Sequence, residues 1–154
     1  MKSKITPFLW FEKDADAAIE YYTSIFKDAK KGPINRMPDG QVITGSFELL
    51  GQEFMILQGG PASFKFNESI SFFVSCKDQA EVDYYWDNLT ADGGEESRCG
   101  WLKDKYGLSW QIVPEALGTC LGDPDPEKAQ RAMKAMMGMK KLIVADLENA
   151  RDGK

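Results

Sequence analysis

The sequence predicts an α+β fold in which two similar halves are followed by a helical tail. Two observations support this: a strand-like segment followed by an amphipathic helix pattern occurs twice, and each helix pattern is followed by further strand-like segments. A length of 154 residues suits one domain with a sizeable core. We therefore expect a single domain over 1–154, with a first module at 1–61, a second module at 62–114 and a tail at 115–154.

The first half opens with an expected strand at residues 5–11, which are rich in aromatic and β-favouring residues. Asp14 is the expected N-cap of a helix, because its carboxylate can accept from the amides of the first turn. Apolar residues follow 4, 7, 8 and 11 positions after Asp14, which is helical spacing: Ala18, Tyr21, Tyr22 and Ile25. The Lys-Gly-Pro sequence at 31–33 breaks this pattern.

Two more strands are expected in the first half. Residues 37–40 form a turn, and residues 41–50 and 53–57 form strands joined tightly at 50–52. The Gly-Gly-Pro sequence at 59–61 then ends the first module.

The second half repeats the layout, with a strand at 70–75 and an N-cap at Asp78, 64 positions after Asp14. Glu81 makes this start a variant capping box. The apolar stripe again lies 4, 7, 8 and 11 positions after the aspartate: Val82, Tyr85, Trp86 and Leu89. Strands are expected at 97–102 and 108–113, joined through 103–107, so internal duplication is the preferred interpretation.

The tail is expected to be helical and unlike either half. Asp125 and Pro126 give an N-cap followed by proline at the first helical position, and Gly138 ends this helix. A last helix is expected at 143–150. The stripe of Ala129, Met133 and Met136 is either a partner or ligand surface or a helix face packed on a sheet edge or a second subunit.

Composition excludes several classes of function. The net charge of −5 argues against a nucleic-acid surface, and no apolar run is long enough to span a membrane or act as a signal peptide. Three scattered cysteines without a CxxC motif suggest reduced thiols, so we expect a cytoplasmic location. The absence of histidine excludes Ser–His–Asp and Cys–His catalysis and leaves only carboxylates and thiolates for a first-row metal.

Five segments resemble the PhnB-like branch of the vicinal oxygen chelate (glyoxalase) superfamily, a branch often labelled demethylubiquinone methyltransferase. They are ITPFLWF (5–11), AIEYY (18–22), GQEFMILQGGP (51–61), CGWLKDKYGLSWQIVP (99–114) and GDPDP (122–126). The resemblance implies paired βαβββ modules that form a curled mixed sheet around a cavity, and a homodimer. It implies less about activity, because one fold hosts many functions.

In metal-using relatives, histidine and glutamate side chains project inward from paired strands. Matching this chain to that pattern places Thr6, Met55, Ser69 and Gln111 at the ligand positions, and none of these is a strong ligand for zinc, iron or manganese. Glu53, two residues from Met55 on the same strand face, is the only nearby acid. The resemblance therefore implies no metal here.

The same register assigns the two faces of each strand. Three groups are expected to face the cavity: Thr6, Phe8 and Trp10; Ser69, Ser71 and Phe73; and Ser109 and Gln111. Facing the helices would be Pro7, Leu9 and Phe11; Ile70, Phe72 and Val74; and Trp110 and Ile112. An overlay of the first strands by 64 residues would slip the register by one and exchange the faces.

Three functions are considered. The favoured one is binding of a small molecule of unknown identity, with Phe8, Trp10, Phe73 and Trp101 stacking on it and Ser71, Ser109 and Gln111 supplying hydrogen bonds. A metal-independent enzyme would use Glu53, Asp104, Tyr106 or Cys99, although Asp104 and Tyr106 also suit a turn and Cys99 a buried position. A structural dimer with a filled cavity is the third. No cofactor is expected, because the Gly-Gly-Pro sequence at 59–61 lacks the following helix of an S-adenosylmethionine site.

Overall fold

The computed structural model describes residues 3–154. The chain forms two compact units, Met1–Phe64 and Lys65–Lys154, and each is described by itself. The expectation of a single domain over 1–154 stays a prediction. None of the helices in 3–154 combines the length and apolar character needed to cross a bilayer.

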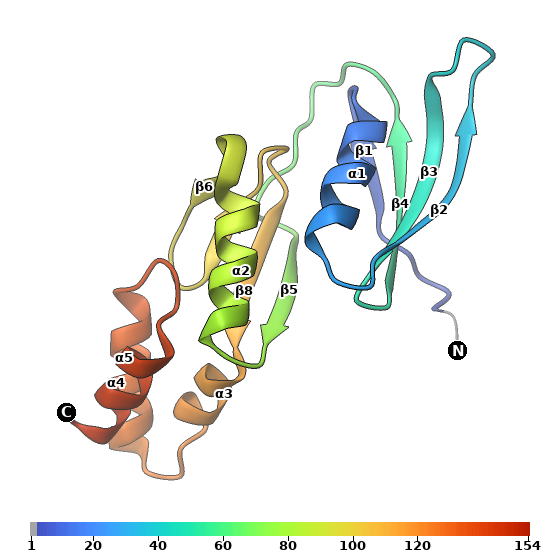
Figure 1. The fold of residues 1–154 in the computed structure, drawn as a ribbon. Coiled ribbons are helices and arrows are strands. Elements are labelled where there is room, and N and C mark those ends of the chain that lie inside the picture. Colours follow the sequence, from blue (N-terminus) through green and yellow to red (C-terminus); the bar gives the residue numbers. More distant parts are fainter. Residues whose placement is uncertain (1–2) are drawn as a thin grey trace. The chain divides into compact units, whose positions relative to one another are not determined.

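The first unit is a βαβββ module (Figure 1). Its elements are β1 (Phe8–Phe11), α1 (Ala15–Ile25), β2 (Lys30–Arg36), β3 (Val42–Leu49) and β4 (Gln52–Gln58). The four strands lie in the order β1-β4-β3-β2, with β1 parallel to β4 and the other pairs antiparallel. Helix α1 covers one face of this sheet.

The second unit repeats this topology and then adds three helices. The module consists of β5 (Ser71–Cys76), α2 (Gln79–Thr90), β6 (Glu95–Glu96), β7 (Trp101–Lys103) and β8 (Ser109–Pro114), with a 3-10 turn at Ala91–Gly93. Its strands lie in the order β5-β8-β7-β6, with β5 parallel to β8. The tail contains α3 (Glu115–Leu121), α4 (Pro126–Met137) and α5 (Val144–Asp152). The α+β class, the paired βαβββ modules and the C-terminal helices are confirmed, as two four-stranded mixed sheets that are not closed.

Helix α1 packs on its sheet through aromatic and aliphatic residues. Tyr22 stacks on Phe47 at 5.7 Å between ring centroids, and Phe47 stacks on Phe54 at 5.3 Å. Gly45 allows close approach, because a Cβ there would lie 2.8 Å from Cδ1 of Ile19. The core of the first unit therefore lies between α1 and one face of the sheet.

The alternation along the strands matches the register that the resemblance implied. Leu9 and Phe11 are buried on the helix side, whereas Phe8 and Trp10 are 50% and 37% exposed on the opposite face. In the second module, Trp110, Ile112 and Val74 are buried on the helix side, and Phe73 is 61% exposed on the open face. An overlay by 64 residues would pair Trp10 with buried Val74, so it describes the repeat of the helices but not that of the first strands.

Side-chain capping is confirmed for two of the three expected N-caps. Asp78 accepts from the backbone N–H of Glu81 at 2.9 Å, and Asp125 accepts from that of Glu127 at 2.9 Å before Pro126. Asp14 is at the N-cap position of α1 as expected, but its expected side-chain cap is wrong: the residue has a left-handed φ of 61° and its side chain makes no cap hydrogen bond. The first turn of α1 is instead capped from the sheet, because Oε1 of Gln58 accepts from the N–H of Ala15 at 3.0 Å.

Several expected boundaries are corrected. The Lys-Gly-Pro sequence at 31–33 lies within β2, where a register shift between Lys31 and Ile34 accommodates it on an edge strand that tolerates proline. Most of the strand expected at 97–102 is instead a turn with positive φ at Cys99 and Gly100, which lies between β6 and β7, and only residues 101 and 102 belong to a strand. Ile70 precedes β5 and is exposed, so it does not face α2. Helix α3 was not expected.

Candidate functional site

The open face of the second sheet brings five of the predicted site residues together. Ser71 lies opposite Ser109, and Gln111 lies between Phe73 and Trp101 on neighbouring strands. They share this face because β5, β7 and β8 alternate, with Trp110 and Ile112 buried on the α2 side. The face therefore combines aromatic, hydroxyl and amide groups.

Gln111 is oriented by its own sheet. Its Nε2 donates a 2.9 Å hydrogen bond to Oγ of Ser71, so the amide is held by the neighbouring strand. The carbonyl oxygen Oε1 is the other half of the amide and can accept from a ligand. Phe73 and Trp101 lie on either side, which places apolar rings beside this polar group.

A pocket of about 460 Å³ lies on this face, next to the tail. This size lies within the range of ordinary small-molecule sites. The sheet and the preceding turn contribute Phe73, Ser75, Cys99, Trp101, Gln111, Val113 and Pro114, and the tail contributes Glu115, Leu117, Gly118, Leu121 and Met136. The lining is mainly apolar, with few polar groups and one charged residue, Glu115.

Ser109 lines a different, smaller cavity of about 120 Å³. Its Oγ is buried and has no hydrogen-bond partner among residues 3–154. Glu68 and Lys103 line the same cavity and form an ion pair, and this contact lowers the pKa of Glu68 and raises that of Lys103. Ser109 is thus separate from the larger pocket.

Asp104 has a structural environment. Its Oδ1 accepts from the backbone N–H groups of Tyr106 at 2.8 Å and Leu108 at 3.1 Å, and its Oδ2 accepts from the indole N–H of Trp110 at 2.9 Å. The side chain is buried, and Gly107 completes the turn with a φ of +87°. These contacts agree with the turn interpretation of Asp104 and Tyr106.

Cys99 lines the pocket from a strained turn. It has a φ of 56° and is half-buried, and its N–H donates to the carbonyl of Met139 at 2.8 Å. The N–H of Gly100 donates to the carbonyl of Lys140 at 2.8 Å, so this turn attaches the tail to the module. Cys76 and Cys120 are buried thiols, and burial raises the pKa of Cys76 to about 12 and also raises that of Cys120.

The remaining candidates lie in the first unit or before β5. Phe8 and Met55 are paired neighbours on the open face of the first sheet. Glu53 is half-buried there, opposite Glu48, which pairs with Lys30 at 3.1 Å. Thr6 precedes β1, and Ser69 lies in a turn before β5, so neither ligand-like position is on a strand.

Trp10 is held by its own unit. Its indole N–H donates to the carbonyl of Gly60 at 3.1 Å, and its ring meets Phe64 edge-on at 5.3 Å. A Cβ at Gly59 would lie 2.2 Å from the ring, so the indole rests on the glycine backbone. This contact covers part of the surface that we expected Trp10 to offer to a ligand.

The groups suggested by the fold's relatives do not fit the residues present. The positions that the resemblance matched to metal ligands are Thr6, Met55, Ser69 and Gln111, and no cluster of three or more His, Cys, Asp or Glu side chains that could hold a metal occurs within 3–154. For S-adenosylmethionine, the turn at Gly59 and Gly60 supports Trp10 and leads into a segment without a helix. We derive no chemistry through either group.

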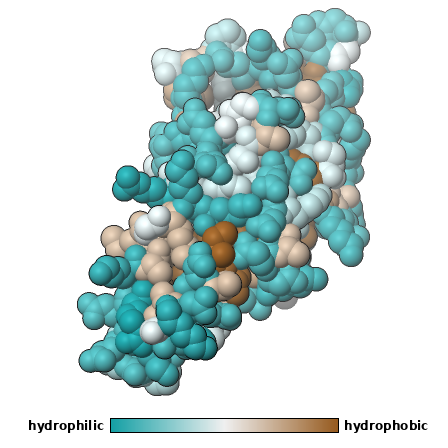
Figure 2. Space-filling model, turned by 60° about the vertical axis from the view of Figure 1, so that its left-hand side comes forward, coloured by the Kyte–Doolittle hydropathy of each residue, from teal (hydrophilic) through white to brown (hydrophobic). Residues whose placement is uncertain are grey.

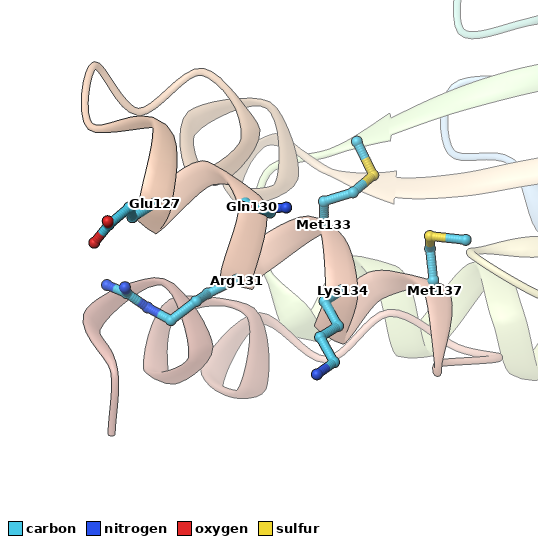
Figure 3. Close-up of a pocket in the computed structure, with 6 residues that line it drawn as sticks. All are labelled: Glu127, Gln130, Arg131, Met133, Lys134 and Met137. Carbon is cyan, nitrogen blue, oxygen red and sulfur yellow. The ribbon is translucent and has the colours of Figure 1, made fainter.

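A separate shallow groove follows α4 (Figure 3). Met133 and Met137 point to one side of the helix, and Arg131 and Lys134 point to the other. Arg131 donates to the backbone carbonyls of Ala150 and Arg151 at the end of α5. The lining residues all belong to one helix: Glu127, Gln130, Arg131, Met133, Lys134 and Met137.

Sequence reasoning found Phe73, Trp101 and Gln111 but missed the tail residues of the pocket. Helix α3 lacks a side-chain N-cap, since Pro114 occupies that position, and it has only seven residues. The available signal was apolar spacing at Leu117, Cys120 and Leu121 after Pro114. That spacing indicates a helix but not which sheet face it covers.

The chain resembles known proteins over its two modules. A model of the 3-demethylubiquinone-9 3-methyltransferase family matches residues 3–113. The PhnB protein from Bacillus cereus, which has been given the same methyltransferase description, is 34% identical with a TM-score of 0.68, over 73% of this chain and 99% of that one. No curated protein matches the chain.

Two more distant solved structures share the fold. Protein PA1353 from Pseudomonas aeruginosa is 14% identical, with a TM-score of 0.60 over 74% of this chain and 98% of that one. The fosfomycin resistance protein FosX from Listeria monocytogenes, solved with Mn(II) and sulfate, is 19% identical, with a TM-score of 0.51 over 71% and 90% of the two chains. At these identities the likeness concerns the fold alone.

Proposed function

The chain belongs to the 3-demethylubiquinone-9 3-methyltransferase (PhnB-like) family of the glyoxalase superfamily, and from that premise we propose that it binds a small, flat organic molecule. The observation that carries the proposal is the pocket of about 460 Å³ on the open face of the second sheet. Its aromatic and aliphatic lining suits a ring system, and Gln111 can fix the orientation of a polar substituent.

The exposure of Phe73 favours an open site over a filled core. An aromatic side chain that filled the sheet face would be buried, whereas Phe73 is 61% exposed beside the pocket. Catalysis is not part of the proposal, because Asp104 is committed to its loop and Glu53 lies in the other unit.

We also propose that binding requires no metal. The chain has no histidine, and the side chains at the ligand-like positions are hydroxyl, thioether and amide groups. Elemental analysis after mild purification should find far less than one zinc, iron or manganese per chain. A stoichiometric metal that ligand binding depends on would refute this part of the proposal.

The test of binding uses 2-naphthalenemethanol as a probe, measured by the change in tryptophan fluorescence and by calorimetry. Phe73→Ala should weaken binding, and Gln111→Leu should weaken it by about 1–3 kcal/mol while leaving the fold intact. Phe8→Ala is the matched comparison, because Phe8 is a similarly exposed aromatic residue on the first sheet. An equal loss there would restore the prediction that Phe8 holds the ligand, and no binding by the unmodified chain would refute the proposed function for this probe class.

A homodimer is proposed as the assembly, with α4 at or near the interface. Met133 and Met137 are 41% and 64% exposed on one side of α4, and they are the apolar part of its groove. The face that Figure 2 shows is mostly hydrophilic, with hydrophobic residues gathered in small patches. Light scattering should report a dimer at micromolar concentration, and the double substitution Met133→Glu, Met137→Glu should give a monomer. A monomeric unmodified chain would contradict the proposal.

A cytoplasmic location is proposed on the state of the thiols. Cys76, Cys99 and Cys120 are all unpaired, and an odd set of unpaired thiols suits a reducing compartment. Fractionation of cells that express the chain tests this proposal.

A further inference from the structure

The pocket on the second sheet has walls of two origins. One wall is the sheet face, which lies within the part of the chain that the family model matches, residues 3–113. The other wall is contributed by α3 and α4, which come after that part. The Bacillus cereus protein is covered over 99% of its length while 73% of this chain is used, so that protein has little that corresponds to the tail. The tail wall is therefore where this chain can differ from its relatives in the ligand it accepts.

Gly118 is the residue of α3 that keeps this wall open. A Cβ built on Gly118 would meet nothing within 4 Å, in contrast to Gly45 or Gly59, whose neighbours exclude a side chain. Gly118 lies inside a helix, where glycine is unfavourable relative to alanine. Neither backbone geometry nor packing requires glycine here, and its effect on the protein is to leave space in the pocket.

Glu115 sets the charge of the same wall. It is the only charged residue that lines the pocket, and its carboxylate has no ion-pair partner among residues 3–154. Lysine and arginine are absent from the lining, so an anionic ligand would meet one negative charge and no compensating cation. Because Glu115 is exposed, this effect is modest and weakens with salt.

We propose that α3 is the selectivity element of the pocket: Gly118 gives a flat ring system room, and Glu115 favours neutral or cationic ligands over anions. The inference rests on the proposed binding function and adds the ligand class. Leu117, Leu121 and Met136 complete the apolar wall around these two residues. A neutral or cationic aromatic compound with a hydrogen-bond donor for Gln111 has the required chemistry.

The test compares three naphthalene probes that differ in charge: 2-naphthalenemethanol, 2-naphthylmethylammonium and 2-naphthoate. We expect the ammonium to bind roughly three- to ten-fold more tightly than the carboxylate at low ionic strength. Raising the salt to about 0.5 M should reduce this difference, because charges at an exposed site are then screened. The neutral alcohol should be insensitive to salt.

Substitutions at Gly118 and Glu115 then distinguish the effect of space in the pocket from the effect of charge. Glu115→Gln should reduce the difference between the affinities for ammonium and carboxylate without changing that for the alcohol, and Glu115→Lys should reduce it further. The difference that remains reflects the hydrogen-bond donor that the ammonium, unlike the carboxylate, offers to Gln111. Glu127→Gln, which removes a carboxylate of α4 outside the pocket, is the control and should change none of the three affinities. Gly118→Leu should weaken all three probes by about ten-fold or more, because its side chain occupies the pocket.

Gly118→Ala supplies a graded test should the leucine variant fold poorly, because it should fold at least as stably as the unmodified chain and weaken all three probes to a smaller extent. If none of the probes binds the unmodified chain, the proposed function fails. If the probes bind but Glu115→Gln leaves the difference between ammonium and carboxylate unchanged, or Gly118→Ala and Gly118→Leu bind as well as the unmodified chain, the selectivity role of α3 is overturned and the binding function stands.

Discussion

The two modules share one strand order but complete their open faces differently. In the first, Trp10 is held down by the backbone of Gly59 and Gly60 from its own unit. In the second, Phe73 stays exposed and the tail closes one side of the face to make a pocket. Each module therefore has a sheet with an open face, but the pocket forms only where the helices that follow the second module cover part of that face.

The largest difference between the modules is expected in the free energy of unfolding that is lost when an aspartate in a turn is replaced. Asp39 and Asp104 both accept from the N–H two residues ahead, at 2.9 Å and 2.8 Å, but Asp39 is exposed and Asp104 is buried with two further donors. Asp104→Ala should therefore lower the free energy of unfolding by about 3–5 kcal/mol, because buried donors lose their acceptor. Asp39→Ala should cost only about 0.5–1 kcal/mol. Urea unfolding measures both, and equal losses would contradict the buried role of Asp104.

A smaller difference is expected between two glycines. Gly45→Ala should destabilise the first module by about 1–3 kcal/mol, because the new Cβ would press on Ile19 beneath α1. Gly118→Ala should instead stabilise the second unit by about 0.5–1 kcal/mol, because it improves a helix without a clash. Thermal unfolding of the two variants measures both effects. A destabilised Gly118→Ala would show that a Cβ at this position meets close neighbours, contrary to the open space found there.

The smallest expected effect is the contribution of two surface ion pairs to the pH dependence of stability. Hydrogen bonding to Arg36 lowers the pKa of Asp16 in the first module, and hydrogen bonding to Lys103 lowers the pKa of Glu68 in the second. A carboxyl whose pKa is lower in the folded state adds stability above its unfolded pKa, and this stability is lost as the pH falls through the folded value. Asp16→Asn and Glu68→Gln should therefore each lose slightly less stability than the unmodified chain between pH 7 and about pH 3. Both pairs are exposed, so a large effect at either would contradict the structure.

Local signals in the sequence predicted most of the fold. Asp78 and Asp125 cap their helices through their own side chains, so the residues that start each helix lie beside it in the sequence. The cap of α1 comes from Gln58, 43 positions after Ala15, and no local pattern indicates it. Strand β2 is not predicted because glycine and proline usually indicate a break, whereas an edge strand with a register shift accommodates both.

The sequence predicted the part of the site that lies on the strands but not the part that the tail contributes. Alternation, in the register that the resemblance implied, placed Ser71, Phe73 and Gln111 on one face, and the structure adds the hydrogen bond that joins two of them. Glu115 and Gly118 were not predicted, because their place in the pocket depends on how α3 turns back over the sheet. That turn depends on long-range packing of Leu117 and Leu121 on the buried cluster around Val113 and Leu142, which the sequence does not display.

The attachment of the tail at Cys99 and Gly100 has a consequence for amide exchange. The N–H groups of these two residues donate to the carbonyls of Met139 and Lys140, which belong to the tail. Their deuterium uptake therefore reports how often the tail lifts off while the module stays folded, since such local openings are less costly than global unfolding. Neighbouring amides such as that of Ile112, bonded to Gly100, would exchange more slowly and report the module itself. A ligand that bridges the sheet and α3 would slow the first pair and leave the second unchanged.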